Sequence, residues 1–195
     1  MDRRQFTIAA LAAAVAAAAT PASAKLYYNP DTNRWEERTV TSNGRGHYTP
    51  IPRIEVPYDG KYKPGTIIVE TAERRLYFVL GGGEALRYGI GVGRDGFRWS
   101  GQHSITRKAE WPGWTPPSEM RRRVPDLPAY MPGGPDNPLG ARALYIGATL
   151  YRIHGTSEPW TIGQAVSSGC IRLTNEDIID LYDRVKVGSL VVVRQ

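Results

Sequence analysis

Cysteine, histidine and long apolar runs are all scarce in this chain of 195 residues. It contains one cysteine, Cys170, and three histidines that lie far apart. A single cysteine excludes an internal disulfide, and the spacing of these residues matches no metal site, so neither a metal nor a cofactor is expected. No apolar run after residue 24 is long enough to span a bilayer, which excludes further membrane spans.

A strong excess of one charge is also missing. The chain has 25 Lys and Arg against 19 Asp and Glu, a net charge of +6, and the only basic run of three is at 121–123. This scattered charge does not predict nucleic-acid binding, but it suits work near an anionic surface or polymer. The 21 glycines and 15 prolines favour turns and short strands over a helical bundle.

Residues 1–24 have the features of a secretory signal peptide. Paired arginines stand at 3–4, residues 8–19 are apolar and rich in alanine, and residues 22–24 read Ala-Ser-Ala. A membrane anchor is the alternative, but the apolar stretch is shorter than the ~20 residues that a spanning helix needs. We expect cleavage before Lys25 and export from the cytoplasm, with the paired arginines resembling a twin-arginine signal.

The remaining chain divides at about residue 65. Residues 25–64 are broken by Pro, Asn and Gly and are predicted to form an irregular leader. Residues 65–195 are expected to form one domain that is rich in β-structure. Its predicted strands are a meander at 66–69, 76–80 and 86–92, further strands at 104–111, 144–146 and 151–153, and a central strand at 190–193.

One helix and one long loop complete the predicted domain. Thr174 and the acidic residues after it form a capping signal, and apolar residues then recur at helical spacing until Gly188 closes the helix. Residues 112–139 are too long for an ordinary connection, and their aromatic residues, Tyr130 among them, favour an ordered lid or cleft wall. The expected fold class is mainly β, with one or two short helices.

A glycine motif at 91–96 suggests a nucleotide site that the rest of the sequence contradicts. It matches the dinucleotide pattern G-x-G-x-x-G, which requires a helix to begin at the glycines. The loop-like residues 97–101 follow instead. We therefore interpret the motif as the end of a strand and a turn.

Cys170 and His154 are the candidate catalytic pair. A thiol attacks well as a thiolate, so it needs a nearby base or positive charge. His154 lies 16 residues upstream, which allows an outward and a return path that brings the two side chains together. A buried, inert cysteine is the alternative for a lone thiol. His103 and His47 are expected to have structural or surface roles.

The residues around Cys170 strengthen this interpretation. Gly169 lets a ligand approach the backbone closely, and successive amides at Ser168, Gly169 and Cys170 are expected to face one oxyanion. Arg172 adds positive charge that favours the thiolate or holds a substrate carboxylate. The carboxylates Asp136 and Glu158 either flank the cleft or are polar loop residues, and the second interpretation is preferred.

Two motifs together resemble a known family. Residues 154–156 read His-Gly-Thr and residues 167–173 read Ser-Ser-Gly-Cys-Ile-Arg-Leu, similar to the active-site signature of the L,D-transpeptidases, the YkuD domain family. Residues 131–140 resemble the preceding loop of periplasmic members of the ErfK/YbiS type. The resemblance covers about 65–193. Many relatives have His where this chain has Ser168, which bears on substrate preference.

The resemblance implies a β-sandwich-like catalytic domain that acts in the periplasm on peptidoglycan stem peptides. Cys170 would attack a tetrapeptide at its diaminopimelate residue and release D-alanine, with His154 as base and the Gly155 carbonyl orienting its ring. The substrate-binding residues would be Arg172, Tyr130 and Met131. The acceptor is either another stem, giving a 3-3 cross-link, or a lysine of an outer-membrane lipoprotein.

Two alternatives remain open at this point. A thiol L,D-carboxypeptidase or amidase would share the fold and the catalytic pair and use water as acceptor. An inactive wall-binding protein would keep the fold without turnover. No residue of the sequence decides between a transferase and a hydrolase.

Overall fold

The computed structural model describes residues 23–29, 34–40, 51–95, 99–123 and 126–195. The predicted signal peptide therefore lies outside the described residues, apart from Ser23 and Ala24, which begin the first strand. None of the helices in the described part of the chain has the length and apolar character needed to cross a bilayer.

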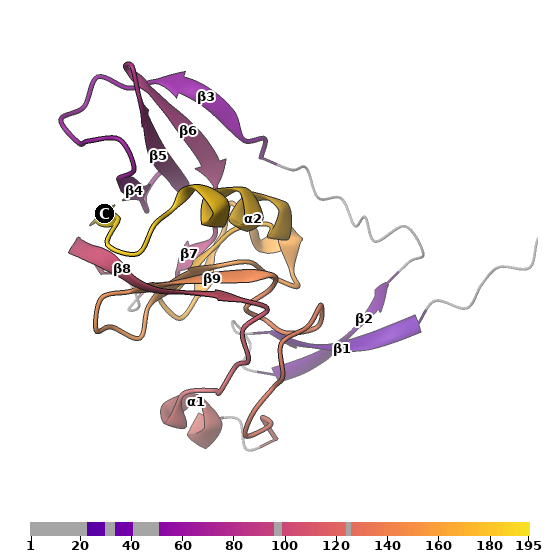
Figure 1. Cartoon of the computed structure of the whole chain (residues 1–195). Coiled ribbons are helices and arrows are strands. Elements are labelled where there is room, and N and C mark those ends of the chain that lie inside the picture. Colours follow the sequence, from indigo (N-terminus) through magenta and orange to yellow (C-terminus); the bar gives the residue numbers. More distant parts are fainter. Residues whose placement is uncertain (1–22, 30–33, 41–50, 96–98, 124–125) are drawn as a thin grey trace, which may run out of the picture.

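A nine-stranded sheet forms the body of the described structure (Figure 1). Its strand order is β12-β10-β9-β8-β13-β4-β5-β6-β3. The strands along the chain are β3 (Ile54–Pro57), β4 (Ile67–Glu70), β5 (Arg75–Gly81), β6 (Glu84–Gly89), β8 (Gly101–Glu110), β9 (Arg142–Ile146), β10 (Arg152–His154), β12 (Ile171–Arg172) and β13 (Leu190–Arg194). The predicted meander is confirmed as β4, β5 and β6, and the last strand, β13, is central as expected.

Two smaller sheets accompany it. Strands β7 (Val92–Gly93) and β11 (Ala165–Ser167) pair in parallel beside the end of the large sheet. Strands β1 (Ser23–Asn29) and β2 (Arg34–Val40) form an antiparallel hairpin.

The segment 25–64, predicted as an irregular leader, contains regular structure: most of β1, and all of β2 and β3, lie there. Strand β3 pairs with β6 and extends the large sheet at its edge. Only four residues long and ended by Pro57, β3 has too little periodicity to be recognised without its partner.

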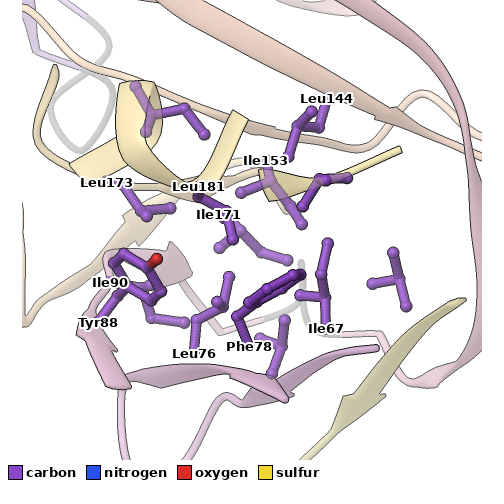
Figure 2. Packing of buried hydrophobic residues seen from close by; sticks show 14 of the residues in the cluster. Ile67, Leu76, Phe78, Tyr88, Ile90, Leu144, Ile153, Ile171, Leu173 and Leu181 are labelled. Carbon is purple, nitrogen blue, oxygen red and sulfur yellow. The ribbon is translucent and has the colours of Figure 1, made fainter. Parts of the chain in front are cut away.

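The hydrophobic core lies between the two halves of the curled sheet (Figure 2). Ile67, Leu76 and Phe78 come from β4 and β5, and they pack in one cluster with Ile153 and Leu144 from β10 and β9. Because strands alternate their side chains, the other face of each half points away from this core. The sandwich-like packing thus comes from one continuous sheet that folds over itself.

Helix α2 (Asn175–Arg184) covers one end of this core with Ile178, Leu181 and the following Val185. The predicted cap is confirmed, since Thr174 Oγ1 accepts a hydrogen bond from the Asp177 amide at 3.1 Å. The helix ends at Arg184, four residues before Gly188, whose positive φ of 92° serves the turn into β13. A second helix, α1 (Ser118–Arg123), lies in the long excursion between β8 and β9. The expected class, mainly β with one or two short helices, is confirmed.

Candidate active site

The strand register brings the two predicted catalytic residues to neighbouring strands. Strands β10 and β12 run parallel, with Ile153 opposite Ile171 and His154 opposite Arg172. The two isoleucines are buried in the core, so His154 and Arg172 lie on the opposite face of the sheet. Cys170 comes directly before β12, beside the strand that ends in His154.

His154 is held in a buried, neutral state. The residue is 3% exposed, and Nδ1 lies 2.6 Å from the Gly155 carbonyl oxygen, the contact that was predicted. Burial, helped by the charge of Arg172, lowers the pKa of His154 to about 3, although backbone hydrogen bonds to Gly155 and Leu139 oppose this shift. When Nδ1 carries the ring proton, it donates a hydrogen bond to the Gly155 carbonyl oxygen. Nε2 then has a free lone pair that can accept a proton.

The loop before Cys170 is fixed by three hydrogen bonds. Gly169 has a φ of 101°, a conformation that favours glycine, and its carbonyl accepts from Trp99 Nε1 at 2.8 Å. Ser167 Oγ donates to the Cys170 carbonyl at 2.5 Å. The Gly169 amide donates to Ser167 Oγ at 3.2 Å. One of the three amides expected to face an oxyanion is therefore engaged within the loop.

Arg172 forms an ion pair that the sequence did not predict. Its Nη1 lies 3.3 Å from Glu158 Oε2, and the two side chains are only 11% and 10% exposed. Glu158 is a loop residue, as interpreted, but it is buried and its carboxylate lies against Arg172 of β12. Much of the Arg172 charge is compensated by this carboxylate. Asp136 is exposed, as a polar loop residue should be.

The described residues of the excursion, 112–123 and 126–139, include a small hydrophobic cluster: Trp114, Met120, Leu127 and Leu139, with Met131 packed against it. Trp114 and Met131 pair through their backbones, and Asn137 Nδ2 donates to the Met131 carbonyl at 3.2 Å. Tyr130 is 60% exposed, whereas Met131 is partly buried. Because Leu139 also contacts His154 through its backbone, the excursion borders the site.

Two site residues were missed by sequence reasoning. Trp99, expected only in a loop, holds the Gly169 carbonyl and stacks on Tyr151 with ring centroids 4.5 Å apart. Asn175 Oδ1 accepts from the Ala141 amide at 2.9 Å. It occupies the space that a side chain at Gly155 would need, with an added Cβ only 2.3 Å away. No local sequence pattern around Trp99 or Asn175 predicts that these residues support the site.

The described part of the glycine motif, residues 91–95, is a short strand followed by a turn, in line with the prediction. Val92 and Gly93 form β7, and Gly91 exchanges backbone hydrogen bonds of 2.9 Å with Arg172 in both directions. No helix follows Gly93 within the described residues that come next, up to Asp95. The His103 ring lies 5.8 Å from Trp99, edge to face, which supports its structural interpretation. Among the residues with described side chains, no three His, Cys, Asp or Glu gather into a metal site.

Comparison with known proteins agrees with this geometry. The family model described as the L,D-transpeptidase catalytic domain (YkuD) matches residues 64–193. The chain is 46% identical over 133 residues to the probable L,D-transpeptidase ErfK/SrfK of Escherichia coli, and 43% identical over 134 residues to the probable L,D-transpeptidase YbiS of the same organism. These matches cover 64% of this chain but only 42% and 43% of the relatives, so the chain spans less than half of their length.

Solved structures show the same fold. A Brucella melitensis protein described as a probable carnitine operon oxidoreductase is 47% identical, with a TM-score of 0.51, over 74% of this chain and 94% of its own. The catalytic domain of the Enterococcus faecium L,D-transpeptidase acylated by ertapenem is 20% identical, with a TM-score of 0.53, over 69% of this chain and 100% of its own. The extent of the match, which includes His154 and Cys170, leads to one conclusion: the chain belongs to the L,D-transpeptidase catalytic domain family.

Proposed function

We propose that this protein is an L,D-transpeptidase that acts on peptidoglycan tetrapeptide stems through an acyl-enzyme on Cys170. The observation that carries the proposal is the buried His154, oriented by the Gly155 carbonyl on the strand next to the Cys170 loop. Membership of the family and the names of the relatives add support.

The first half-reaction forms a thioester. His154 Nε2 takes the proton of the Cys170 thiol, and the sulfur attacks the carbonyl carbon of the amide that links diaminopimelate to the terminal D-alanine. The C–N bond then breaks, and the D-alanine amine leaves with the proton held by His154. The imidazolium formed in the first step is thus the acid that supplies the proton to the leaving amine.

The second half-reaction transfers the acyl group. An amine of a second stem, or a lysine of a lipoprotein, attacks the thioester carbon and loses a proton to His154, which restores the thiol. The amides of Ser168 and Cys170 are the proposed donors to the oxyanion in both steps. Tyr130 and Met131 belong to the proposed substrate wall, and no metal or cofactor takes part in the proposed chemistry.

We also propose export to the periplasm by the twin-arginine route, with residues 1–24 as the signal peptide. The paired arginines, the apolar stretch and the small residues before Lys25 support this placement. Expression of the full chain in wild-type cells and in cells without the twin-arginine translocase, followed by fractionation, tests it. A mature chain in the periplasm of both strains would contradict the route but leave export standing.

Mass spectrometry of the protein incubated with a disaccharide-tetrapeptide tests the function. We expect a covalent adduct on Cys170 and a dimer joined through two diaminopimelate residues. A tripeptide product alone, in the presence of acceptor stems, would support the L,D-carboxypeptidase alternative. Absence of any adduct, with the substrate or with a carbapenem, would support an inactive wall-binding protein.

Substitution of the two catalytic residues makes the mechanism testable. Cys170→Ala is expected to abolish release of D-alanine, and His154→Ala to slow it on the order of 10²-fold or more, because the thiol loses its base. Release of D-alanine by the Cys170→Ala variant at the wild-type rate would end the thiol mechanism. Thermal unfolding of both variants verifies that they are folded.

A further inference from the structure

A row of three side chains lies on the face of the sheet that points away from the core. In the register of β8, β9 and β10, Tyr145 is opposite Arg107 on one side and Arg152 on the other. Leu144 and Ile153, one position along, are buried in the core. Alternation therefore puts Tyr145 and Arg152 on the other face, and we call Arg107, Tyr145 and Arg152 the arginine–tyrosine ladder.

The two guanidinium groups share one aromatic ring. The Cζ atoms of Arg107 and Arg152 lie 3.6 Å and 5.3 Å from the centroid of Tyr145. A tyrosine ring attracts cations over its face but supplies no negative charge to neutralise them. The ladder therefore concentrates two positive charges around one half-buried ring.

The described residues offer the ladder no carboxylate partner. Within the part of the chain that the structure describes, no ion pair is formed by Arg107 or Arg152, and Arg152 Nε is buried without a hydrogen-bond partner. A guanidinium nitrogen that is buried and unpaired costs free energy unless a ligand supplies an acceptor. The Nε atoms of Arg87, Arg142 and Arg172 share this condition, but Arg152 alone combines it with a place in the ladder, where its donor is open to an anionic ligand.

The ladder adjoins the catalytic pair. Arg152 is two residues before His154 on the same strand, so both side chains lie on the same face, and its charge is among those that act on His154. Ile153 pairs with Ile171, which places Arg152 level with Cys170 on the neighbouring strand. Arg172, the other cation here, also has a buried Nε without a partner, but its charge is compensated by Glu158, so Arg152 is better placed to hold an anion.

We propose that the arginine–tyrosine ladder is the subsite that binds a carboxylate of the peptide whose acyl group is transferred. This proposal rests on the proposed function, because a tetrapeptide stem carries free carboxylates near the bond that Cys170 attacks. Guanidinium groups suit this ligand, since their paired N–H donors match the two oxygens of a carboxylate.

Equilibrium binding on the Cys170→Ala background tests the proposal without turnover. The probes are the synthetic tetrapeptide L-Ala-D-Glu-diaminopimelate-D-Ala and derivatives of it in which one carboxylate at a time is amidated. We expect amidation of one particular carboxylate to weaken binding about 10-fold, as the loss of a charge-assisted pair does. Arg152→Gln should weaken binding of the free acid by a similar factor and abolish the effect of amidation.

Further variants separate the ladder from a general effect of charge or folding. Arg152→Lys keeps the charge but loses the planar fork of N–H donors. Its affinity for the free acid should lie between those of the parent and of Arg152→Gln. Arg107→Gln should weaken binding of the free acid but not of the amide. Lys63→Gln removes one exposed positive charge ahead of β4 and should leave both dissociation constants unchanged.

Equal binding of acid and amides by the parent, or no measurable binding of any peptide, would overturn the ladder as a carboxylate subsite. So would an Arg152→Gln variant that keeps the preference for the free acid. Release of D-alanine by the wild-type chain, assayed with the same peptides, tests the proposed function separately. If the enzyme turns over acid and amide alike, only the carboxylate subsite is contradicted. If the protein binds the acid more tightly but releases no D-alanine, only the proposed function is contradicted.

Discussion

Burial of His154 sets its chemistry at the scale of single residues. A histidine in water has a pKa near 6.5, and burial lowers the pKa of His154 to about 3. The folded protein therefore keeps this ring neutral far into the acidic range, whereas the unfolded chain protonates it below about pH 6.5. The unfolded state binds the extra proton, so folding stability falls as the pH drops from 6.5 toward 3.

The pH dependence of unfolding measures this effect. Between pH 6 and 4, His154 should contribute a loss of stability of up to about 1.4 kcal/mol per pH unit, the value for one proton. Urea titrations at several pH values, on the wild type and on His154→Gln, isolate the contribution as a difference between two slopes. Equal slopes in the two proteins would show that the imidazole titrates alike in the folded and unfolded states.

The buried ion pair between Arg172 and Glu158 is a second interaction of single residues that stabilises the site. Removing one partner of a buried pair leaves an uncompensated charge and commonly costs about 3–5 kcal/mol. The Arg172 backbone also forms hydrogen bonds with Gly91. Arg172 is therefore held through its side chain by Glu158 and through its backbone by Gly91. Glu158 is thus a structural support of the catalytic strand.

At the scale of elements, helix α2 is stabilised at both ends. Thr174 caps its start, and Lys108 from β8 reaches its last carbonyls, with Nζ donating to Tyr182 at 2.5 Å and to Val185 at 2.6 Å. A positive charge is favourable at the C-terminal end of a helix, where the carbonyl groups lack partners. The cap was readable from the sequence because it is local, whereas Lys108 lies more than 70 residues from the carbonyls that it contacts.

Lys108→Met should destabilise the protein by about 1–2 kcal/mol, because it keeps the apolar stem and removes the charge and both hydrogen bonds. Urea unfolding measures the loss. Lys186→Met provides the matched control, since Lys186 is an exposed residue just after the same helix, and its substitution should change stability by less than about 0.5 kcal/mol. Equal losses in the two variants would mean that Lys108 has no special role at the helix end.

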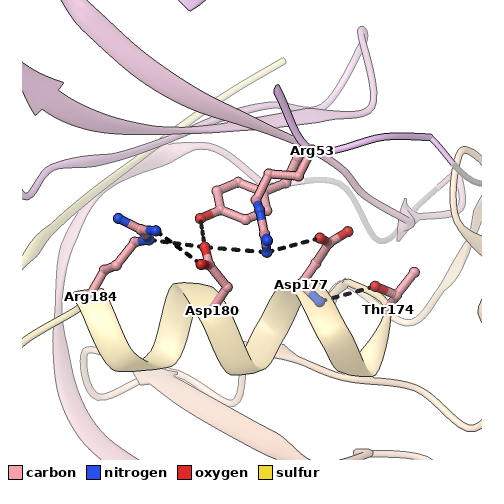
Figure 3. Close-up of polar contacts among 6 residues, drawn as sticks. Arg53, Thr174, Asp177, Asp180 and Arg184 are labelled. Atoms are coloured by element: carbon pink, nitrogen blue, oxygen red, sulfur yellow. Dashed lines mark hydrogen bonds and ion pairs between the residues drawn. The ribbon is translucent and has the colours of Figure 1, made fainter. Parts of the chain in front are cut away.

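At the scale of the whole molecule, the folded domain begins before the family match. The match starts at residue 64, but β3 completes the sheet edge at β6, and Ile51 fills the space beside Gly89 and Gly163. Arg53 lies between Asp177 and Asp180 of α2, 3.5 Å and 3.4 Å from their oxygens, and Tyr88 donates to Asp180 at 2.6 Å (Figure 3). The segment 51–57 therefore ties the sheet edge to the helix.

Truncation tests this boundary. A chain that begins at residue 51 should match the stability of one that begins at residue 25 to within about 0.5 kcal/mol. A chain that begins at residue 65 should lose about 3 kcal/mol or more, or fail to fold, because it exposes the β6 edge and the apolar surface beneath Ile51. Urea unfolding of the three chains gives the comparison. If the shortest chain were as stable as the others, the domain would begin at residue 65, as the sequence predicted.

The sequence by itself indicated the candidate catalytic pair, the family resemblance, the strands of the meander, the central last strand and the start of α2. Each depends on neighbours close in the chain: a cap, an alternation, or a motif around His154 or Cys170. Only the tertiary structure decided the partners of Arg172 and Gly169, the place of β3, and the ladder around Tyr145. These depend on strand register and on contacts between distant segments, because only the folded sheet brings Glu158 to Arg172, Trp99 to Gly169 and two arginines to one ring.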